Sequence, residues 1–399
     1  MSASTVSPLA GLRVLLVTAF DPAAIGNGSS MRAGRWCAAL RAASGTFDAV
    51  VVPVVGSEPA SPFRRVVLPD EQAIVRGAAT LMGVRWRDWM VRTAPLPPSA
   101  ARAPAWMGRQ LLADLSAGGV AGDGWQPDLV IAFKMAVAPF AADLAMDCGV
   151  PLVVDLDDDE AALAAAQQNP HADALERLLR GVGELATVLT VASPTDVPTV
   201  QARVAAPVML VPNAVPLPDL LPVGLAGRLL YVANFEYGPN RASANWLLQS
   251  VLPLIRGVSE LSVVGAFGDR LGAQPPAVAY GRLPDLDACY RDASVVVCPV
   301  LAGSGTSIKV IEAMAHGRAV VTTSVGARGL GLTHGVHALI ADDPAGFAAA
   351  VTRVLASPAE AAALGAGGRA LVAERYSAEV GAAAMAGAAA AAAAAALGR

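Results

Sequence analysis

The chain has 399 residues, enough for two large domains or three small ones. Hydrophobic residues make up 54% of it and charged residues only 16%, which excludes a disordered chain and allows sizeable cores. The formal net charge is −4 and no basic block is interleaved with aromatic residues, so we expect no nucleic-acid partner. The N-terminus lacks a signal-peptide pattern and no run of about 18 strongly apolar residues occurs, so we expect a cytoplasmic protein.

Short apolar runs alternate with longer alanine-rich segments from Arg13 onward, which is typical of parallel strands joined by crossover helices. In the first half, the expected strands are 13–18, 48–54, 128–133, 151–156, 187–191 and 208–211. In the second half, they are 228–233, 261–265, 278–281, 294–300, 318–323 and 337–341. The pattern therefore predicts two doubly wound α/β domains.

Four prolines interrupt residues 211–227 and exclude a regular helix or a central strand there. We therefore expect a first domain over 1–212, an interdomain linker over 213–227 and a second domain over 228–380. Residues 381–399 are expected to form an alanine-rich C-terminal tail, helical by propensity and frayed at its end.

The loop after the expected strand 294–300 carries the strongest functional signal, because ligands bind outside the carboxyl ends of parallel strands. Gly303 and Gly305 let the backbone approach a ligand closely. Ser304 and Thr306 can cap the next helix, and their hydroxyl groups can donate hydrogen bonds. The helix N-terminus adds unpaired N–H groups and a positive dipole end. This combination predicts a phosphate site.

A polar face continues from this loop along the helix. At about 100° per residue, Gly305, Lys309, Glu312 and His316 share one side of it. Lys309 is one of only two lysines in the chain, with Lys134, and from the first turn it can contact a diphosphate, while Glu312 can accept hydrogen bonds from ribose hydroxyls. The alternative is a solvated ion pair of Lys309 with Glu312. His316 precedes a glycine, so we expect it to cap the helix C-terminus.

Residues 303–330, with 281–299 before them, resemble the donor half of family 4 glycosyltransferases of the GT-B architecture. Residues 231–253 and 211–216 resemble the start of that family's second domain and its interdomain segment. The resemblance implies two Rossmann-like domains facing across a cleft, the first on the acceptor side and the second binding the nucleotide sugar. It also implies a retaining hexosyl transfer from a nucleotide-diphosphate sugar, without a metal ion or other cofactor.

Under this resemblance, Glu312 matches the second glutamate of the family's paired motif, which holds the donor ribose. The first glutamate belongs at position 304, where this chain has Ser304. The expected catalytic residues are therefore Lys309, Ser304 and Glu312. The expected donor-binding residues are Gly303, Ser304, Gly305, Thr306, Lys309, Glu312, Arg282 and Asn234.

The loop after the first expected strand contains Gly26 and Gly28 but lacks the third glycine of a dinucleotide fingerprint. In a glycosyltransferase this glycine loop closes over the reaction centre, and Arg32 is expected to face the diphosphate. The alternative for Arg32 is a plain surface arginine. Lys134 stands where family members often carry a catalytic histidine, and is either an acceptor-site cation or the neutralising partner of an acid cluster.

That acid cluster is the run at 153–160, which contains Asp155, Asp157 and Asp158. Three interpretations are open: acceptor recognition or helix capping, a solvated turn, or a metal site at the Asp155-x-Asp157 pair. We favour acceptor recognition or helix capping for Asp155 and Asp158, and expect no metal.

These observations predict a glycosyltransferase whose acceptor is a glycan, a lipid-linked molecule or a small molecule, with polysaccharide synthesis as the family's common setting. The alternatives are a nucleotide-sugar epimerase and a catalytically silent nucleotide-binding partner, since the first motif glutamate and the histidine are absent. Trp86, Trp89 and Trp106 lie among arginines and offer either a packed lid or a peripheral contact with the inner membrane face.

Overall fold

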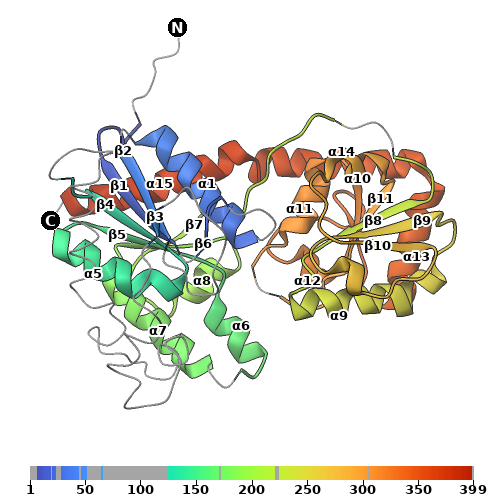
Figure 1. The fold of residues 1–399 in the computed structure, drawn as a ribbon, viewed down its shortest axis with the longest axis horizontal. Coiled ribbons are helices and arrows are strands. Elements are labelled where there is room, and N and C mark those ends of the chain that lie inside the picture. Colours follow the sequence, from blue (N-terminus) through green and yellow to red (C-terminus); the bar gives the residue numbers. More distant parts are fainter. Residues whose placement is uncertain are drawn as a thin grey trace, which may run out of the picture. The chain divides into compact units, whose positions relative to one another are not determined.

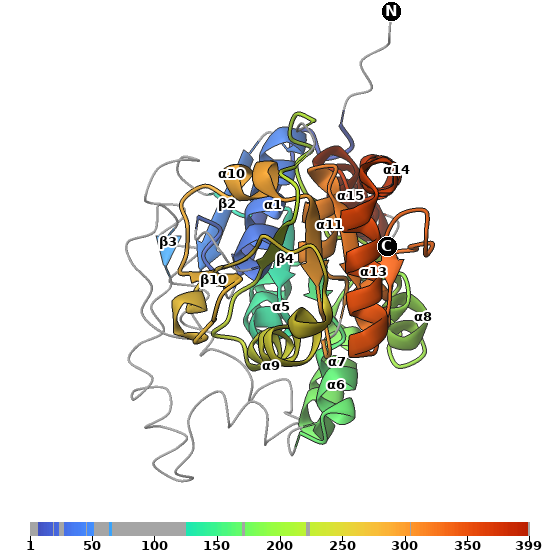
Figure 2. The same ribbon diagram turned by 90° about the vertical axis from the view of Figure 1, so that its right-hand side faces the viewer.

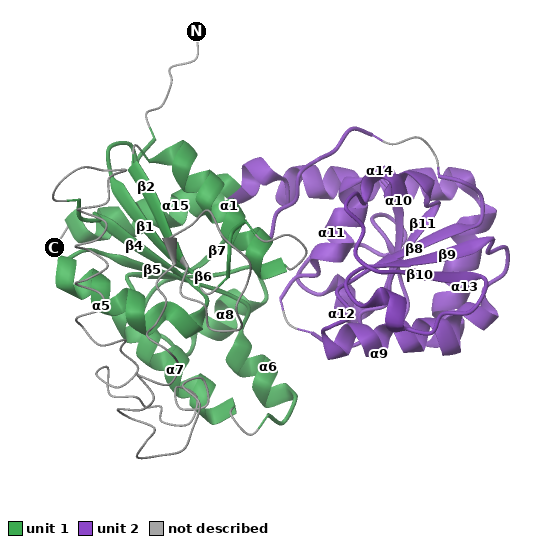
Figure 3. Cartoon of the chain, in the orientation of Figure 1, with its two compact units in different colours: residues 1–211, 382–399 green, residues 212–381 purple. Residues whose placement is uncertain are grey.

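The computed structural model describes residues 7–18, 20–23, 28–44, 46–51, 64–65, 125–169, 172–220, 224–303 and 305–397. The chain forms two compact units, one of Met1–Val211 with Ala382–Arg399 and one of Pro212–Gly381 (Figure 3). Each unit is a parallel sheet covered by helices (Figure 1), so the two doubly wound α/β domains expected from the sequence are confirmed.

The first unit contains a seven-stranded sheet of order β3-β2-β1-β4-β5-β6-β7, in which every pair is parallel. Its strands are β1 (Arg13–Thr18), β2 (Thr46–Val51), β3 (Arg64–Arg65), β4 (Leu129–Phe133), β5 (Leu152–Asp157), β6 (Val188–Val191) and β7 (Val208–Leu210). Its helices are α1 (Gly28–Ala43), α5 (Ala138–Cys148), α6 (Glu160–Ala166), α7 (Ala172–Leu185), α8 (Asp196–Gln201) and most of α15 (Ala378–Leu397).

Strand β1 shows why the expected apolar runs fold as central strands. Alternate residues of a strand point to opposite faces of the sheet, so a strand covered on both sides must be apolar throughout. Leu15 and Val17 lie in the cluster that α5 and α7 complete, whereas Val14 and Leu16 lie in the cluster that α1 and α15 complete. The course of these helices around the first sheet can be followed in Figures 1 and 2.

The second unit contains a six-stranded parallel sheet of order β10-β9-β8-β11-β12-β13. Its strands are β8 (Arg228–Val232), β9 (Glu260–Val264), β10 (Ala277–Tyr280), β11 (Val295–Cys298), β12 (Ala319–Thr322) and β13 (Leu339–Ile340). Its helices are α9 (Gly238–Trp246), α10 (Asp287–Asp292), α11 (Ile308–Ala315), α12 (Ser324–Ala327), α13 (Pro344–Ala356) and α14 (Pro358–Arg375). All twelve expected strands are present in the two sheets, and the two-residue β3 was not expected.

The C-terminal segment differs from the expected tail over 381–399. Helix α15 begins in the second unit and continues into the first, where Met385, Ala388, Ala389 and Ala392 are fully buried in the cluster that contains Trp36. Alanine suits this place because its small side chain lets the helix approach the sheet closely. By length and composition α15 is also apolar enough to cross a membrane, and 28% of its apolar window is buried in the protein.

The expected linker over 213–227 is likewise not free of contacts. The backbone N–H of Val215 donates to the Tyr376 carbonyl oxygen at 2.8 Å, and Arg369 donates through Nη2 to the Pro218 carbonyl oxygen at 2.7 Å. Its first residues therefore pack on the second unit, and the boundary falls between Val211 and Pro212.

Replacing a buried alanine of α15 should destabilise the first unit. Ala389→Glu places an unpaired charge in the core and should lower the free energy of unfolding by about 3–5 kcal/mol. Ala383→Glu, at an exposed position of the same helix, is the matched control and should change it by about 0.5 kcal/mol or less. Urea denaturation of both variants checks this, and equal losses would show that α15 does not pack as described.

Candidate functional site

The loop between β11 and α11 follows the carboxyl end of a central strand of the second sheet. Gly303 has φ 155° and Gly305 has φ 64°, conformations that side-chain-bearing residues rarely adopt, so glycine is required at both places. Ser304, between them, lies outside the described residues. Ser307 is the N-cap residue of α11, and its side chain makes no capping hydrogen bond.

Contrary to the expectation from the sequence, Thr306 does not cap the helix. Its hydroxyl oxygen instead accepts a hydrogen bond from Asn213 Nδ2 at 3.1 Å, and both side chains are buried. Asn213 is the second residue of the unit, directly after the chain leaves the first unit. The glycine loop is therefore held in place by the segment that begins the second unit.

Lys309 lies in the first turn of α11 and is half-buried. Its Nζ donates to Asn240 Oδ1 at 2.7 Å and lies 5.8 Å from the centre of the Tyr231 ring. Among the described residues no carboxylate pairs with it, so the alternative ion pair with Glu312 is not present. Burial lowers the pKa of Lys309 below its ordinary 10.5. A half-buried ammonium with only neutral partners favours binding of an anion.

Glu312 lies one helical turn beyond Lys309 and is half-buried on the same face. Burial, followed by the charge of Glu312, raises the pKa of Tyr290, which places the carboxylate near that ring. His316 is the C-cap residue of α11, as expected: its Nδ1 lies 2.8 Å from the Glu312 carbonyl oxygen. The His316 ring stacks on Tyr290 with ring centres 3.9 Å apart. His316 thus has a structural role.

The loop from β8 to α9 and the loop after β10 supply the other expected donor-binding residues. Asn234 Oδ1 accepts a backbone hydrogen bond from within its own loop at 3.0 Å, so this side chain shapes the loop. Arg241 donates to two carbonyl oxygens of the same loop, and Arg282 is exposed after β10. Because β8, β10 and β11 run in the same direction, these loops and Lys309 lie at one edge of the sheet.

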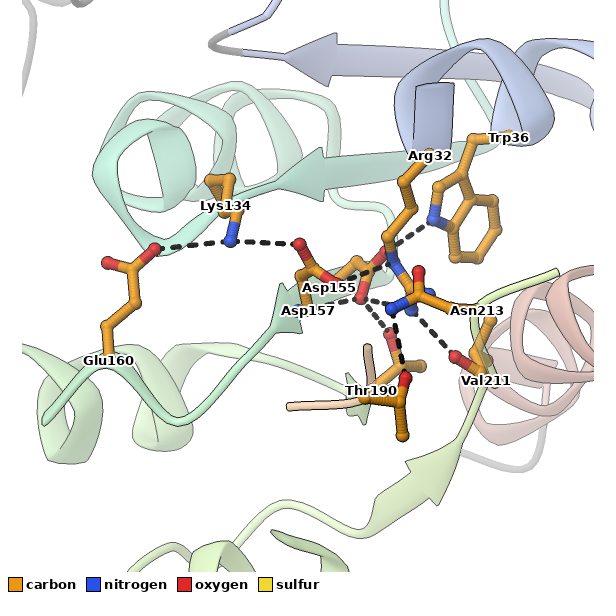
Figure 4. A network of polar contacts seen from close by, with 10 residues as sticks. Arg32, Trp36, Lys134, Asp155, Asp157, Glu160, Thr190, Val211 and Asn213 are labelled. Carbon is orange, nitrogen blue, oxygen red and sulfur yellow. Dashed lines mark hydrogen bonds and ion pairs between the residues drawn. The ribbon is translucent and has the colours of Figure 1, made fainter. Parts of the chain in front are cut away.

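In the first unit, Arg32 of α1 and Asp155 of β5 form a fully buried, bidentate ion pair (Figure 4). Arg32 Nε and Nη2 lie 2.8 and 2.9 Å from the two carboxylate oxygens. Asp155 also accepts hydrogen bonds from Trp36 Nε1 and, at 2.9 Å, from Thr190 Oγ1. Arg32 Nη2 donates further to the Val211 carbonyl oxygen at 2.8 Å.

This pair overturns two expectations. Arg32 neither faces a diphosphate nor lies on the surface, and Asp155 does not contact an acceptor, because their side chains are 1% and 0% exposed and bind each other. Burial alone would raise the pKa of Asp155, but the charge and hydrogen bonds of Arg32, with those of Trp36 and Thr190, lower it. One sequence signal was missed: Trp36 lies one turn after Arg32, on the same helix face.

The cluster around Lys134 lies at the carboxyl ends of β4 and β5. Lys134 Nζ is 3.0 Å from Asp157 Oδ2 and 3.4 Å from Glu160 Oε1, so this lysine neutralises the acid cluster (Figure 4). Burial would lower the pKa of Lys134, but the surrounding carboxylates raise it. The residue that caps α6 is Asp159, whose side chain accepts a hydrogen bond from the backbone N–H of Ala162 at 3.0 Å.

Asp158 is the half-buried carboxyl group of this cluster, and burial together with the charge of Asp157 raises its pKa from 3.8 to about 7. Gly28 is the first residue of α1, while Gly26 and the region of Trp86, Trp89 and Trp106 lie outside the described residues. Within the described part of the chain, no group of three or more His, Cys, Asp or Glu residues could hold a metal ion.

Removing one partner of the buried pair should destabilise the first unit. Arg32→Met leaves the Asp155 carboxylate buried without its cation and should lower the free energy of unfolding by about 3–5 kcal/mol. The double variant Arg32→Met, Asp155→Leu removes both charges and should recover part of that loss. Denaturant titration of the two variants tests this, and an equal loss in both would argue against the pair.

The raised pKa of Asp158 predicts a pH-dependent stability. The folded state keeps the Asp158 proton up to a pH of about 7, whereas the unfolded state loses it near its ordinary value of 3.8. Stability is therefore lost as the pH rises through this window. Asp158→Asn cannot ionise, so its thermal midpoint should exceed that of the wild type more at pH 8 than at pH 5. The same difference at both pH values would contradict the shift.

Part of the second unit matches a known family. Residues 226–357 match the family model "Glycosyl transferases group 1". A curated relative is an uncharacterized 44.6 kDa protein from the cps region of Klebsiella pneumoniae, 27% identical over 142 residues. That match covers 30% of this chain and 35% of the relative, so the two are similar over about a third of their lengths.

Solved structures resemble the chain over most of its length. Sucrose-phosphate synthase from Thermosynechococcus elongatus has a TM-score of 0.67 at 20% identity, covering 94% of this chain and 97% of that one. Anabaena HepE in complex with UDP and glucose has a TM-score of 0.63 at 13% identity, covering 93% and 97%. Residues 226–357 therefore resemble the group 1 glycosyl transferases, and the chain as a whole has the fold of these solved structures, the GT-B architecture that the sequence resemblance implied.

Proposed function

We propose that this protein transfers a hexosyl group from a nucleotide-diphosphate sugar to an acceptor hydroxyl, with retention of configuration and without a metal ion. The observation that carries the proposal is Lys309. Its ammonium has only neutral partners and stands at a glycine loop and a helix N-terminus, which is an arrangement suited to a diphosphate. HepE has been solved with UDP-glucose, which makes a UDP-sugar the first donor to test.

In the proposed reaction, the bond between the anomeric carbon and the diphosphate oxygen breaks, and a bond from the anomeric carbon to the acceptor oxygen forms. The acceptor proton leaves with the departing diphosphate or to solvent. The charge that develops on the leaving group is stabilised by Lys309 and by N–H groups of the loop. Glu312 accepts hydrogen bonds from the donor ribose, and Ser304 contacts the sugar.

Within the first unit, we place acceptor binding at the edge of the sheet that carries Lys134 and Asp158. The relative from a cps region supports a glycan or lipid-linked acceptor of polysaccharide synthesis, with a small-molecule acceptor as the alternative. A cytoplasmic location, with peripheral contact at the inner membrane face, fits such an acceptor.

A panel of nucleotide sugars, incubated with the purified protein, tests the proposal against its two rivals. A transferase releases nucleoside diphosphate, slowly with water and faster with an acceptor. A nucleotide-sugar epimerase interconverts the sugar without release, and a silent partner binds a nucleotide with no turnover. Parallel reactions with EDTA test the metal: abolished activity that manganese restores would overturn metal independence.

Removing the Lys309 ammonium should weaken donor binding. A charge-assisted hydrogen bond to phosphate contributes roughly 1.5–3 kcal/mol, so Lys309→Ala should raise the Kd for UDP about tenfold or more while the protein stays folded. Lys309→Arg keeps the charge and should lose less, which makes it the matched control. Calorimetric titration measures both, and an unchanged Kd for Lys309→Ala would remove this lysine from the donor site.

A further inference from the structure

Asn240, in the first turn of α9, connects the loop after β8 to helix α11. Its Nδ2 donates to the Asn234 carbonyl oxygen at 2.8 Å, and its Oδ1 accepts from Lys309 Nζ at 2.7 Å. A carbonyl oxygen can only accept and an ammonium can only donate, so these two partners fix the orientation of the amide. Asn240 thereby joins the loop after β8 to the helix that follows β11.

The two lysines of this chain have opposite surroundings. Lys134 contacts the carboxylates of Asp157 and Glu160, which compensate its charge. Lys309 is held at a similar distance, but by an amide. An aspartate at position 240 would have nearly the same shape and would neutralise the ammonium. An asparagine holds the ammonium in place and leaves its charge uncompensated.

We propose that Asn240 is a positioning residue of the donor site, which fixes the Lys309 ammonium and, because it is uncharged, leaves that charge for the diphosphate of the donor. This inference rests on the proposed function. It assigns to a neutral side chain a role that a search for charged ligands misses. Asn240 acts through Lys309 and need not touch the donor.

Two variants separate the position of the ammonium from its charge. Asn240→Ala removes both hydrogen bonds, so Lys309 becomes less ordered and the Kd for UDP should rise by a few-fold. Asn240→Asp also loses the bond to the Asn234 carbonyl oxygen, but it adds a carboxylate beside Lys309. Its Kd should rise further, by about tenfold or more over the wild type. Pyrophosphate, which carries the charges and no base, should show the same order.

The Lys309→Gln background shows whether the effect passes through the lysine. Without the ammonium, Asn240→Asp and Asn240→Ala should differ much less in their Kd for UDP than they do in the wild-type background. If Asn240 only stabilised the fold, Asn240→Ala and Asn240→Asp would weaken UDP binding equally, and they would do so whatever residue stands at position 309. Thermal midpoints without ligand identify any variant that has lost its fold. The Kd values are then compared only between variants that are folded.

The outcomes distinguish this inference from the proposed function. If the wild type binds none of UDP, GDP, ADP and pyrophosphate, the proposed function fails and the inference fails with it. If the wild type binds but Asn240→Asp equals Asn240→Ala, the inference alone is overturned. The expected result is graded binding: wild type tightest, then Asn240→Ala, then Asn240→Asp.

Discussion

Parallel strand pairing is the constraint on which both units depend. It requires a covering layer of helices on each face of the sheet, and it brings the carboxyl ends of all strands to one edge. For this reason Asn234, Arg282 and Thr306, far apart in the sequence, belong to loops at the same edge of the second sheet. The same rule brings Lys134 and Asp157 together at the ends of β4 and β5 in the first.

Charge compensation separates the residues that hold the fold from those available to a ligand. Arg32 and Asp155 satisfy each other in the core, and taking either away leaves a buried charge without a partner. Lys309 is different because nothing among the described residues compensates it, although burial already disfavours its charged form. The proposed diphosphate site rests on this lack of a counter-charge among the described residues.

The sequence predicted the strands well, because runs of β-branched residues bounded by turn residues have few other structures available. It also predicted a tight glycine loop between β11 and α11, since Gly303 and Gly305 are needed for their backbone conformations. It failed where partners are distant: Arg32 and Asp155 are 123 positions apart, and each alone resembled a ligand-binding residue. It likewise missed the burial of α15, because alanine reports helix propensity but not which surface the helix covers.

The absence of the first motif glutamate changes where stabilisation of the reaction has to come from. As the proposed bond to the leaving group breaks, positive charge develops on the sugar ring and negative charge on the diphosphate. A serine at position 304 supplies no charge to the ring, so the departing diphosphate itself is the nearest anion. In the proposed site, Lys309 stabilises this leaving group. In the proposed site, an ammonium held by a neutral asparagine binds the diphosphate, whose remaining negative charge stays near the ring.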